Sequence, residues 1–163
     1  MDEVVKIRNI FHHPVHFVAF GFGSGLLPKA PGTWGTMAAI PIYLLLSSLP
    51  LWLYGAILLF LIIFAIYACG VTAKDLGAHD YPGIVLDEVV GFLLTMIAMP
   101  KTWLAIATGF VLFRIFDIWK PWPIGWVNKR VNGGFGIVLD DLLAAIFAWL
   151  MLQVLLYVWL FYE

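Results

Sequence analysis

The longest stretch without a charged residue is the feature that most limits how this chain can fold. Residues 30–73, 44 in a row, contain no Asp, Glu, Lys or Arg, and residues 142–162 form a second such stretch of 21. A transmembrane helix needs about 20 apolar residues, so the second stretch can hold one span and the first could hold two. The chain is 63% hydrophobic and 12% charged, against about 45–50% and about 25% in soluble domains. We therefore expect an integral membrane protein.

The order of apolar and polar segments predicts an all-α, polytopic membrane helix bundle with four to five membrane segments. We expect these segments at residues 36–48, 51–71, 84–99, 102–119 and 137–161. The first is short and contains Pro41, so it either crosses the membrane or enters it only part of the way. All 163 residues are expected to form one domain, with the bundle at 36–162.

The N-terminal residues have a different composition from the bundle. The stretch 1–20 mixes basic and apolar side chains, which predicts an interfacial helix rather than a span. Residues 21–36 contain five glycines and two prolines, and we expect a Gly/Pro-rich loop there because neither residue suits a helix interior.

Lys and Arg are distributed unequally between the two sets of predicted loops. Eight of the nine fall on the side that holds residues 1–35, 72–84 and 120–136, and Lys101 falls on the other. By the positive-inside rule the first side is cytoplasmic. The net charge of −1 argues against a nucleic-acid partner, and the single cysteine excludes a disulfide framework.

Two pairs of adjacent carboxylates occur in the same local pattern. Asp87 and Glu88 follow three apolar residues at the start of one predicted segment, and Asp140 and Asp141 do so at the start of another. Acids in a first helical turn can simply complement the helix dipole. Acids between apolar runs near a bilayer are costly, however, and are more often functional. We therefore favour a functional role for both pairs.

Basic side chains accompany these acids. Arg114, Asp117 and Lys120 are spaced three residues apart, so they share one helix face near the predicted cytoplasmic boundary. They form either an ion pair with a neighbouring lysine that extends to the interface or a set of ligands for phosphate.

The Gly/Pro-rich loop has two interpretations of its own. Its freed backbone N–H groups, together with Ser24, Lys29, Thr33 and Thr36, could cradle a phosphate ahead of a helix N-terminus. Alternatively, the loop is a turn in which Thr33 or Thr36 serves as the helix N-cap. The pattern of a Walker A loop, GxxxxGK[ST], is absent.

The predicted topology brings the acids and bases to one level of the membrane, because two of their segments start on the cytoplasmic side and one ends there. The residues placed together in this way are Asp87, Glu88, Arg114, Asp117, Lys120, Asp140 and Asp141. Four or more carboxylates in one cleft repel one another unless a cation is present. Ligation by oxygen alone suits Mg²⁺ or Mn²⁺ rather than zinc. With Arg and Lys available for anionic oxygens, the cluster predicts metal-assisted phosphoryl chemistry.

Four motifs of the chain resemble those of the bacterial phosphatidylglycerophosphatase A family. They read GFGSGLLPKAPGTWGT, IVLDEVVG, FRIFDIWKPWPI and GGFGIVLDDLLA, keep the family's order and spacing, and cover roughly residues 16–150. The resemblance implies an enzyme, a phosphoric monoester hydrolase that uses Mg²⁺ to remove the terminal phosphate of phosphatidylglycerophosphate. The products would be phosphatidylglycerol and inorganic phosphate. It also implies the bacterial inner membrane, with the active site facing the cytoplasm.

The resemblance also implies roles for individual residues. The implied ligands of one or two Mg²⁺ ions are Asp80, Asp87, Glu88, Asp140 and Asp141. The resemblance implies substrate binding by Gly32, Thr33, Gly35, Arg114 and Lys120, and the composition of the loop adds Lys29 and Thr36 to the expected substrate-binding residues. The implied catalytic set is Thr33, Asp87, Glu88, Arg114, Asp117, Lys120 and Asp141. In this scheme Asp117 orients Arg114 or acts as a general acid, and the nucleophile is water or Thr33.

Other classes of protein account less well for the sequence. The DGxxAR pattern of CDP-alcohol phosphotransferases is absent, and so is the pairing that histidine-dependent lipid phosphatases need. The alternative is a non-catalytic membrane transporter or lipid-binding protein with an anion or metal site at the cytoplasmic face. A path through the membrane would need polar residues at mid-depth, but the predicted segments 51–71 and 137–161 have uncharged interiors, which favours a surface site. The sequence leaves open the number of metal ions, the oligomeric state and the head-group selectivity.

Overall fold

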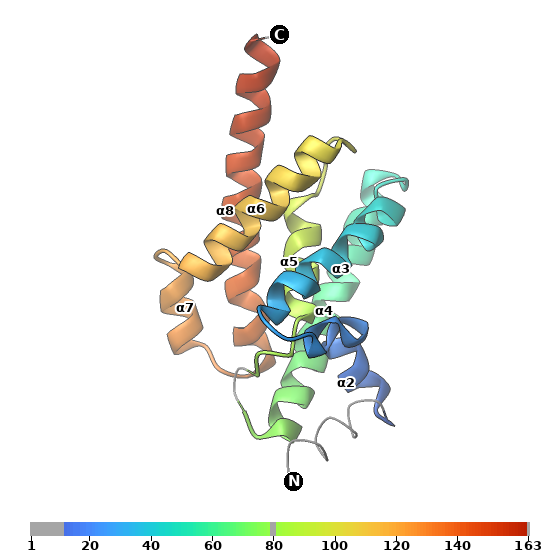
Figure 1. The fold of residues 1–163 in the computed structure, drawn as a ribbon, viewed down its shortest axis with the longest axis vertical. Helices are drawn as coiled ribbons and strands as arrows, with labels where there is room; N and C mark the ends of the chain where they lie inside the picture. Colours follow the sequence, from blue (N-terminus) through green and yellow to red (C-terminus); the bar gives the residue numbers. More distant parts are fainter. Residues whose placement is uncertain (1–11, 79–80, 163) are drawn as a thin grey trace.

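The structure is a computed structural model that describes residues 12–78 and 81–162, and these residues contain helices and no β-strand (Figure 1). This confirms the predicted all-α class. The helices, in chain order, are α2 (Pro14–Ala19), the 3₁₀ helix η1 (Gly21–Leu26), α3 (Pro31–Leu46), α4 (Leu51–Leu76), α5 (Leu86–Thr95), α6 (Trp103–Trp119), α7 (Ile124–Arg130) and α8 (Gly133–Tyr162).

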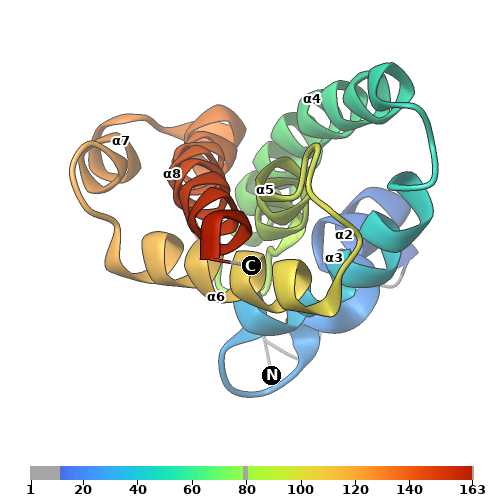
Figure 2. The ribbon, with the colours of Figure 1, turned by 90° about the horizontal axis from the view of Figure 1, so that it is seen from above.

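Helix α8 is the centre of the bundle. It contacts α4, α5, α6 and α7, and in Figure 2 these helices surround it while α2 and α3 lie beyond α5. The contact between α4 and α8 is very close at one point, because a Cβ atom on Gly134 would lie 1.9 Å from the backbone oxygen of Ile66. Small residues allow this approach of two helix backbones. The C-terminal part of α8 extends beyond the other helices (Figure 1).

Two of the helices, α4 and α8, are long and apolar enough to cross a membrane, over Leu51–Leu76 and Gly133–Trp159. The others are shorter: α3 has 16 residues, α6 has 17 and α5 has 10. At about 1.5 Å per residue α5 is about 15 Å long, half the thickness of a hydrocarbon core of about 30 Å. The expectation of four to five membrane segments therefore stays a prediction, while two candidate spans are observed.

Side chains from other helices satisfy the backbone where α5 ends inside the bundle. The Tyr54 hydroxyl donates a hydrogen bond to the backbone oxygen of Leu93 at 2.6 Å, and Trp149 Nε1 donates to that of Ile97 at 3.0 Å. The last carbonyls of a helix lack intrahelical partners, and an apolar environment offers no water to replace them. These two aromatic residues therefore allow α5 to be short.

The loop predicted at residues 21–36 is wrong in part, because this stretch includes η1 and the start of α3. Pro31 is the first residue of α3, where its missing N–H group costs no hydrogen bond. Gly35 lies inside this helix, and close packing explains why the residue is a glycine. A Cβ atom there would lie 2.5 Å from that of Val85. The predicted loop at 120–136 likewise contains α7.

The predicted interfacial helix at 1–20 lies largely outside the described residues, which begin at residue 12. Its described part holds α2, which packs against the end of α4. There the two side chains of His16 and Thr72 are joined by a hydrogen bond of 2.9 Å between Nδ1 and Oγ1. His16 Nε2 also lies 3.3 Å from an oxygen of Asp75.

Candidate active site

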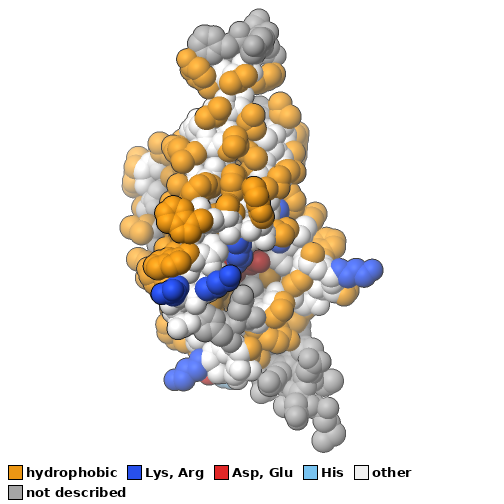
Figure 3. All heavy atoms as spheres, turned by 90° about the vertical axis from the view of Figure 1, so that its left-hand side faces the viewer, with side chains coloured by type: hydrophobic (Ala, Val, Ile, Leu, Met, Phe, Trp, Pro, Cys, Tyr) orange, Lys and Arg blue, Asp and Glu red, His pale blue; other side chains and the backbone are white. Residues whose placement is uncertain are grey.

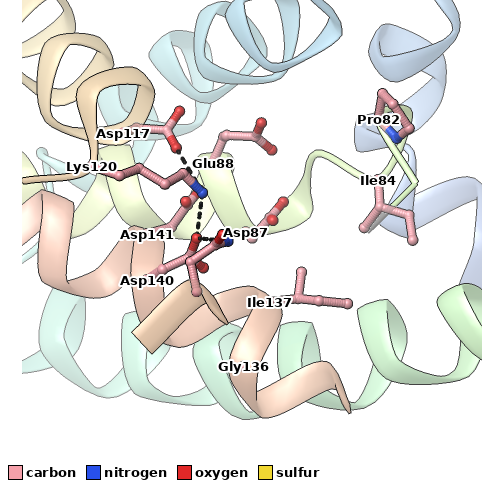
Figure 4. Close-up of a pocket in the computed structure, with 11 residues that line it drawn as sticks. Pro82, Ile84, Asp87, Glu88, Asp117, Lys120, Gly136, Ile137, Asp140 and Asp141 are labelled. Carbon is pink, nitrogen blue, oxygen red and sulfur yellow. Dashed lines mark hydrogen bonds and ion pairs between the residues drawn. The ribbon is translucent and has the colours of Figure 1, made fainter. Parts of the chain in front are cut away.

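A cavity of about 290 Å³ lies between four helices (Figure 4). It is lined by residues from the N-terminal end of α5, the early turns of α8, the C-terminal end of α6 and helix α7. Five of the residues that line it are acids, and one is a lysine. The lining residues are Pro82, Ile84, Asp87, Glu88, Asp117, Lys120, Asn128, Gly136, Ile137, Asp140 and Asp141. Both predicted acid pairs are therefore in one cavity, as the sequence suggests.

Asp87 and Glu88 occupy the first turn of α5, as predicted. The start of this helix is fixed by a hydrogen bond from the backbone N–H of Val85 to the backbone oxygen of Ala19 at 2.9 Å. The preceding turn is tightly packed, because a Cβ atom on Gly83 would lie 2.4 Å from the ring of Phe20. The segment between α2 and α3 thus helps to position the first acid pair.

Asp140 and Asp141 lie deeper in their helix than predicted. Helix α8 begins at Gly133, so the pair follows about two helical turns instead of occupying the first one. The prediction of a first-turn position is wrong for this pair. Because the helix dipole acts within the first turn, it does not explain two acids that are only 2% and 3% exposed. A structural capping role is thereby excluded.

Three of the acids form a compact group. Asp87, Glu88 and Asp141 each offer a carboxylate oxygen within 4.8 Å of those of the other two, and Figure 4 shows them directed into the same space. Asp87 Oδ1, Glu88 Oε2 and Asp141 Oδ2 are buried and have no hydrogen-bond partner among the described residues. Buried oxygens of this kind are costly unless a proton or cation reaches them. A hard divalent cation fits this donor set.

Asp140 faces a different set of partners. Its Oδ2 atom accepts hydrogen bonds from Lys120 Nζ and from Asn128 Nδ2, the latter at 2.8 Å. Burial lowers the pKa of Lys120, but the hydrogen bond and the charge of Asp140 outweigh burial and hold that pKa above its usual range. Lys120 is therefore a fixed cation at the cavity, and its Nζ atom is also 3.9 Å from Asp117 Oδ1.

Arg114 connects α6 to the first turn of α5. Its Nη1 atom donates a hydrogen bond to Asp117 and lies 3.9 Å from Glu88 Oε1, while its buried Nε has no partner among the described residues. Gly32, at the start of α3, packs against both side chains. A Cβ atom at Gly32 would lie 2.2 Å from Glu88 Oε1 and 3.0 Å from Arg114 Nη1. The start of α3 therefore closes this side of the site.

Two residues predicted to bind substrate, Gly35 and Thr36, are buried and packed against other parts of the protein. Thr36 is buried, and its hydroxyl donates a hydrogen bond of 2.8 Å to the backbone oxygen of Gly32. Gly35 packs against Val85. The interpretation of Thr33 or Thr36 as an N-cap is wrong, because the N-cap of α3 is Ala30 and no side chain caps this end.

The other predicted residues are placed less centrally. Thr33 is half-buried in the first turn of α3, close in sequence to Gly32, and Lys29 is exposed in the turn before that helix. Lys29 has a left-handed backbone with φ of 63°. Asp80 lies outside the described residues.

Asn128 is a site residue that sequence reasoning missed. It lies on α7 and belongs to none of the acidic or basic groups that point to phosphate chemistry. Its contact with Asp140 depends on how α7 folds back onto α8. No local sequence signal could have identified it.

Two helices long and apolar enough to cross a membrane, and a buried group of acids beside an arginine and a lysine, fit the class of membrane-associated phosphatases. A sequence model of the phosphatidylglycerophosphatase A family matches residues 17–156, and the chain belongs to that family. This confirms the resemblance and the expectation of a phosphatase.

Relatives from three bacteria are similar to the chain, and two of them carry the name of this family. Phosphatidylglycerophosphatase A of Escherichia coli (strain K12) is 47% identical over 145 residues, which cover 88% of this chain and 84% of the relative. The Haemophilus influenzae protein of the same name is 44% identical over 140 residues, 83% of this chain and 85% of its own. A Bacteroides thetaiotaomicron protein, provisionally named a phosphatidylinositol-3-phosphatase, is 37% identical over 84% of this chain and 90% of its own. No solved structure matches the chain.

Proposed function

We propose that the protein is a Mg²⁺-dependent lipid phosphatase that hydrolyses the terminal phosphomonoester of phosphatidylglycerophosphate. The products are phosphatidylglycerol and inorganic phosphate. The observation that carries the proposal is the group formed by Asp87, Glu88 and Asp141, whose unpartnered oxygens face one space beside Arg114 and Lys120. The names of the two relatives at 44–47% identity support this choice of substrate.

In this proposal Asp87, Glu88 and Asp141 hold Mg²⁺. When bound, the ion would supply Lewis-acid catalysis to the phosphoryl group. Asp140 holds Lys120 in place through Oδ2, and its second oxygen remains a candidate ligand. Asp80 also remains a candidate ligand, although it lies outside the described residues.

Arg114 and Lys120 bind the phosphate in this proposal. Arg114 Nη1 lies 3.9 Å from Glu88 Oε1, and Lys120 lines the same cavity and pairs with Asp140. The two cations can therefore neutralise charge that develops on the phosphoryl oxygens. Asp117 is a positioning residue, because it accepts a hydrogen bond from Arg114. The nucleophile is water, with Thr33 as the alternative.

The proposed location is the bacterial inner membrane, with the site at the cytoplasmic face. Two observations support it. Helices α4 and α8 can each cross the bilayer, and eight of the nine Lys and Arg residues fall in segments predicted to be on the side of the site. Further helices that cross the membrane would bring the total to the four to five of the sequence-based prediction. A phosphate at the lipid surface would then meet the cavity while the acyl chains stay in the bilayer.

Release of phosphate by the purified full-length chain in mixed micelles tests the proposal. We expect release from phosphatidylglycerophosphate that stops with EDTA and returns with Mg²⁺. Asp87→Asn and Asp141→Asn should lower kcat about 100–1,000-fold, the scale on which loss of one preorganised electrostatic interaction slows an enzyme, with melting curves that show a folded protein. Lys101→Ala is the control, because this lysine contacts Ser48 at the far end of the bundle.

The same assay separates the alternatives. Release that continues in EDTA, or in Asp141→Asn at near-normal rates, would overturn the metal assignment. No release at all from folded protein would favour a non-catalytic transporter or lipid-binding protein. Phosphatidylinositol 3-phosphate should be included as a second substrate because of the third relative's name; faster release from it would overturn the choice of head group.

A further inference from the structure

Helix α7 presents one face to the interior of the protein and another to its surroundings. Ile124 and Val127 are buried, and α7 packs along α8. Trp126, Lys129 and Arg130 are exposed on its outer side. A helix with this distribution packs against its own protein on one side and faces solvent or lipid on the other.

Two further exposed tryptophans come shortly before α7 in the chain, Trp119 at the end of α6 and Trp122 in the turn that follows. Trp119, Trp122 and Trp126 are 74%, 81% and 52% exposed, respectively. Tryptophan is enriched where a membrane meets water, because its ring is apolar and its N–H group is polar. Figure 3 views the side of the molecule on which α7 lies and shows Lys and Arg side chains beside a band of hydrophobic ones. We call Trp119, Trp122, Trp126, Lys129 and Arg130 the Trp–basic face.

The charge of the Trp–basic face has one sign. Residues 119–130 contain three basic residues and no acid, and neither Lys129 nor Arg130 pairs with a carboxylate of the described chain. The Arg130 guanidinium lies over the Trp126 ring, 5.8 Å from its centroid, which keeps the charge next to the apolar surface. Apolar rings combined with uncompensated cations are complementary to anionic lipid head groups.

The opposite side of the same helix reaches the site. Asn128 donates its hydrogen bond to Asp140 inside the cavity, and Lys120, between α6 and α7, lines that cavity. A lipid head group held on the Trp–basic face would therefore be separated from the cavity by about the width of one helix, roughly 10 Å. Lipid bound there is a local supply of substrate and needs only lateral movement to react.

We propose that the Trp–basic face binds the head groups of anionic phospholipids and concentrates them next to the site, on the outer side of α7. The inference rests on the proposed function, because it describes how the lipid substrate would be brought to that active site. Each basic side chain near an anionic surface strengthens its attraction roughly five-fold at low ionic strength. Removing two should raise the KM for substrate, expressed as a mole fraction, about 5–25-fold.

Two measurements on the full-length protein in phosphatidylcholine bilayers test this proposal. The first is the KM for phosphatidylglycerophosphate of the double variant Lys129→Gln, Arg130→Gln, which should rise while kcat changes less than two-fold. The second is the selection of spin-labelled phosphatidylglycerol over spin-labelled phosphatidylcholine by the protein's lipid shell, which should fall in the variant. Lys101→Gln, at the far end of the bundle, should change neither.

Salt provides a test that needs no substitution. Raising NaCl from 20 to 500 mM should increase the wild-type KM by about the same factor as the double variant, and should affect that variant little. Equal selection of both spin-labelled lipids by the wild type, or an unchanged KM in the variant, would overturn the proposal. Lipid selection does not require turnover, so it remains informative if phosphatidylglycerophosphate is not the substrate.

Discussion

Asp141→Asn should make the metal-free protein more stable. The oxygens of Asp87, Glu88 and Asp141 lie within 4.8 Å of one another, and at an effective dielectric constant of about 20 two unit charges at this distance repel by about 3.5 kcal/mol. The substitution removes two of the three repulsive pairs. Proton uptake by one acid already relieves part of this repulsion, so we expect a gain of about 1–3 kcal/mol, or roughly 2–12 °C in melting temperature for a chain of this size.

The assay is thermal unfolding in detergent, first with EDTA and then with Mg²⁺. The wild type should gain stability when Mg²⁺ is added, because binding to the folded state stabilises it, and Asp141→Asn should not. Asp117→Asn is the matched control, since it removes a buried acid whose partner is Arg114. That variant should lose stability in EDTA because it removes the charged, hydrogen-bonded partner of Arg114, a largely buried cation. Destabilisation of both variants to the same extent would refute the idea that repulsion dominates at Asp141.

Two further substitutions test the packing that supports the site. Gly32→Ala should lower kcat at least ten-fold because its Cβ atom would lie 2.2 Å from Glu88 Oε1, whereas Gly55→Ala, with nothing within 4 Å, should keep full activity; equal activities in the phosphatase assay would contradict this. Tyr54→Phe should cost about 1–3 kcal/mol because it removes the 2.6 Å hydrogen bond to the end of α5. Tyr67→Phe, which alters an exposed side chain, should leave the denaturation midpoint unchanged.

The sequence predicts that the two acid pairs lie close together, but it does not predict which partners each acid contacts. Charge-free stretches identified helices that start on the same side, which is enough to bring Asp87 and Glu88 near Asp140 and Asp141. Consecutive residues of a helix point about 100° apart, so the two acids of a pair need not share their partners, although Asp87 and Glu88 do. Asp141 faces the acids of α5 and Asp140 faces Lys120 and Asn128. The rotation of α8 about its axis determines which of the two residues, Asp140 or Asp141, faces the acids of α5.

The lengths of the helices depend on contacts that no local pattern contains. Residues 84–99 are apolar apart from their two acids and Thr95, and nothing in them indicates that α5 ends at Thr95. The end is possible because Tyr54 and Trp149 supply donors from α4 and α8. The start of α3 is a similar case, because glycine and proline favour a loop locally while close packing at the site requires Gly32 within a helix.

The charges around the cavity place a limit on what must bind there besides the substrate. Among the described residues, five acids line it and two cations, Arg114 and Lys120, contact those acids, which leaves a net charge of −3 when all are ionised. A phosphomonoester carries a charge of about −2 at neutral pH and would be repelled. One divalent cation reduces the net negative charge of the site but leaves it negative, and a second divalent cation makes the net charge positive. We therefore expect phosphate release to depend on the square of the free Mg²⁺ concentration when Mg²⁺ is scarce. A first-order dependence would show that one ion, with a protonated acid, is sufficient.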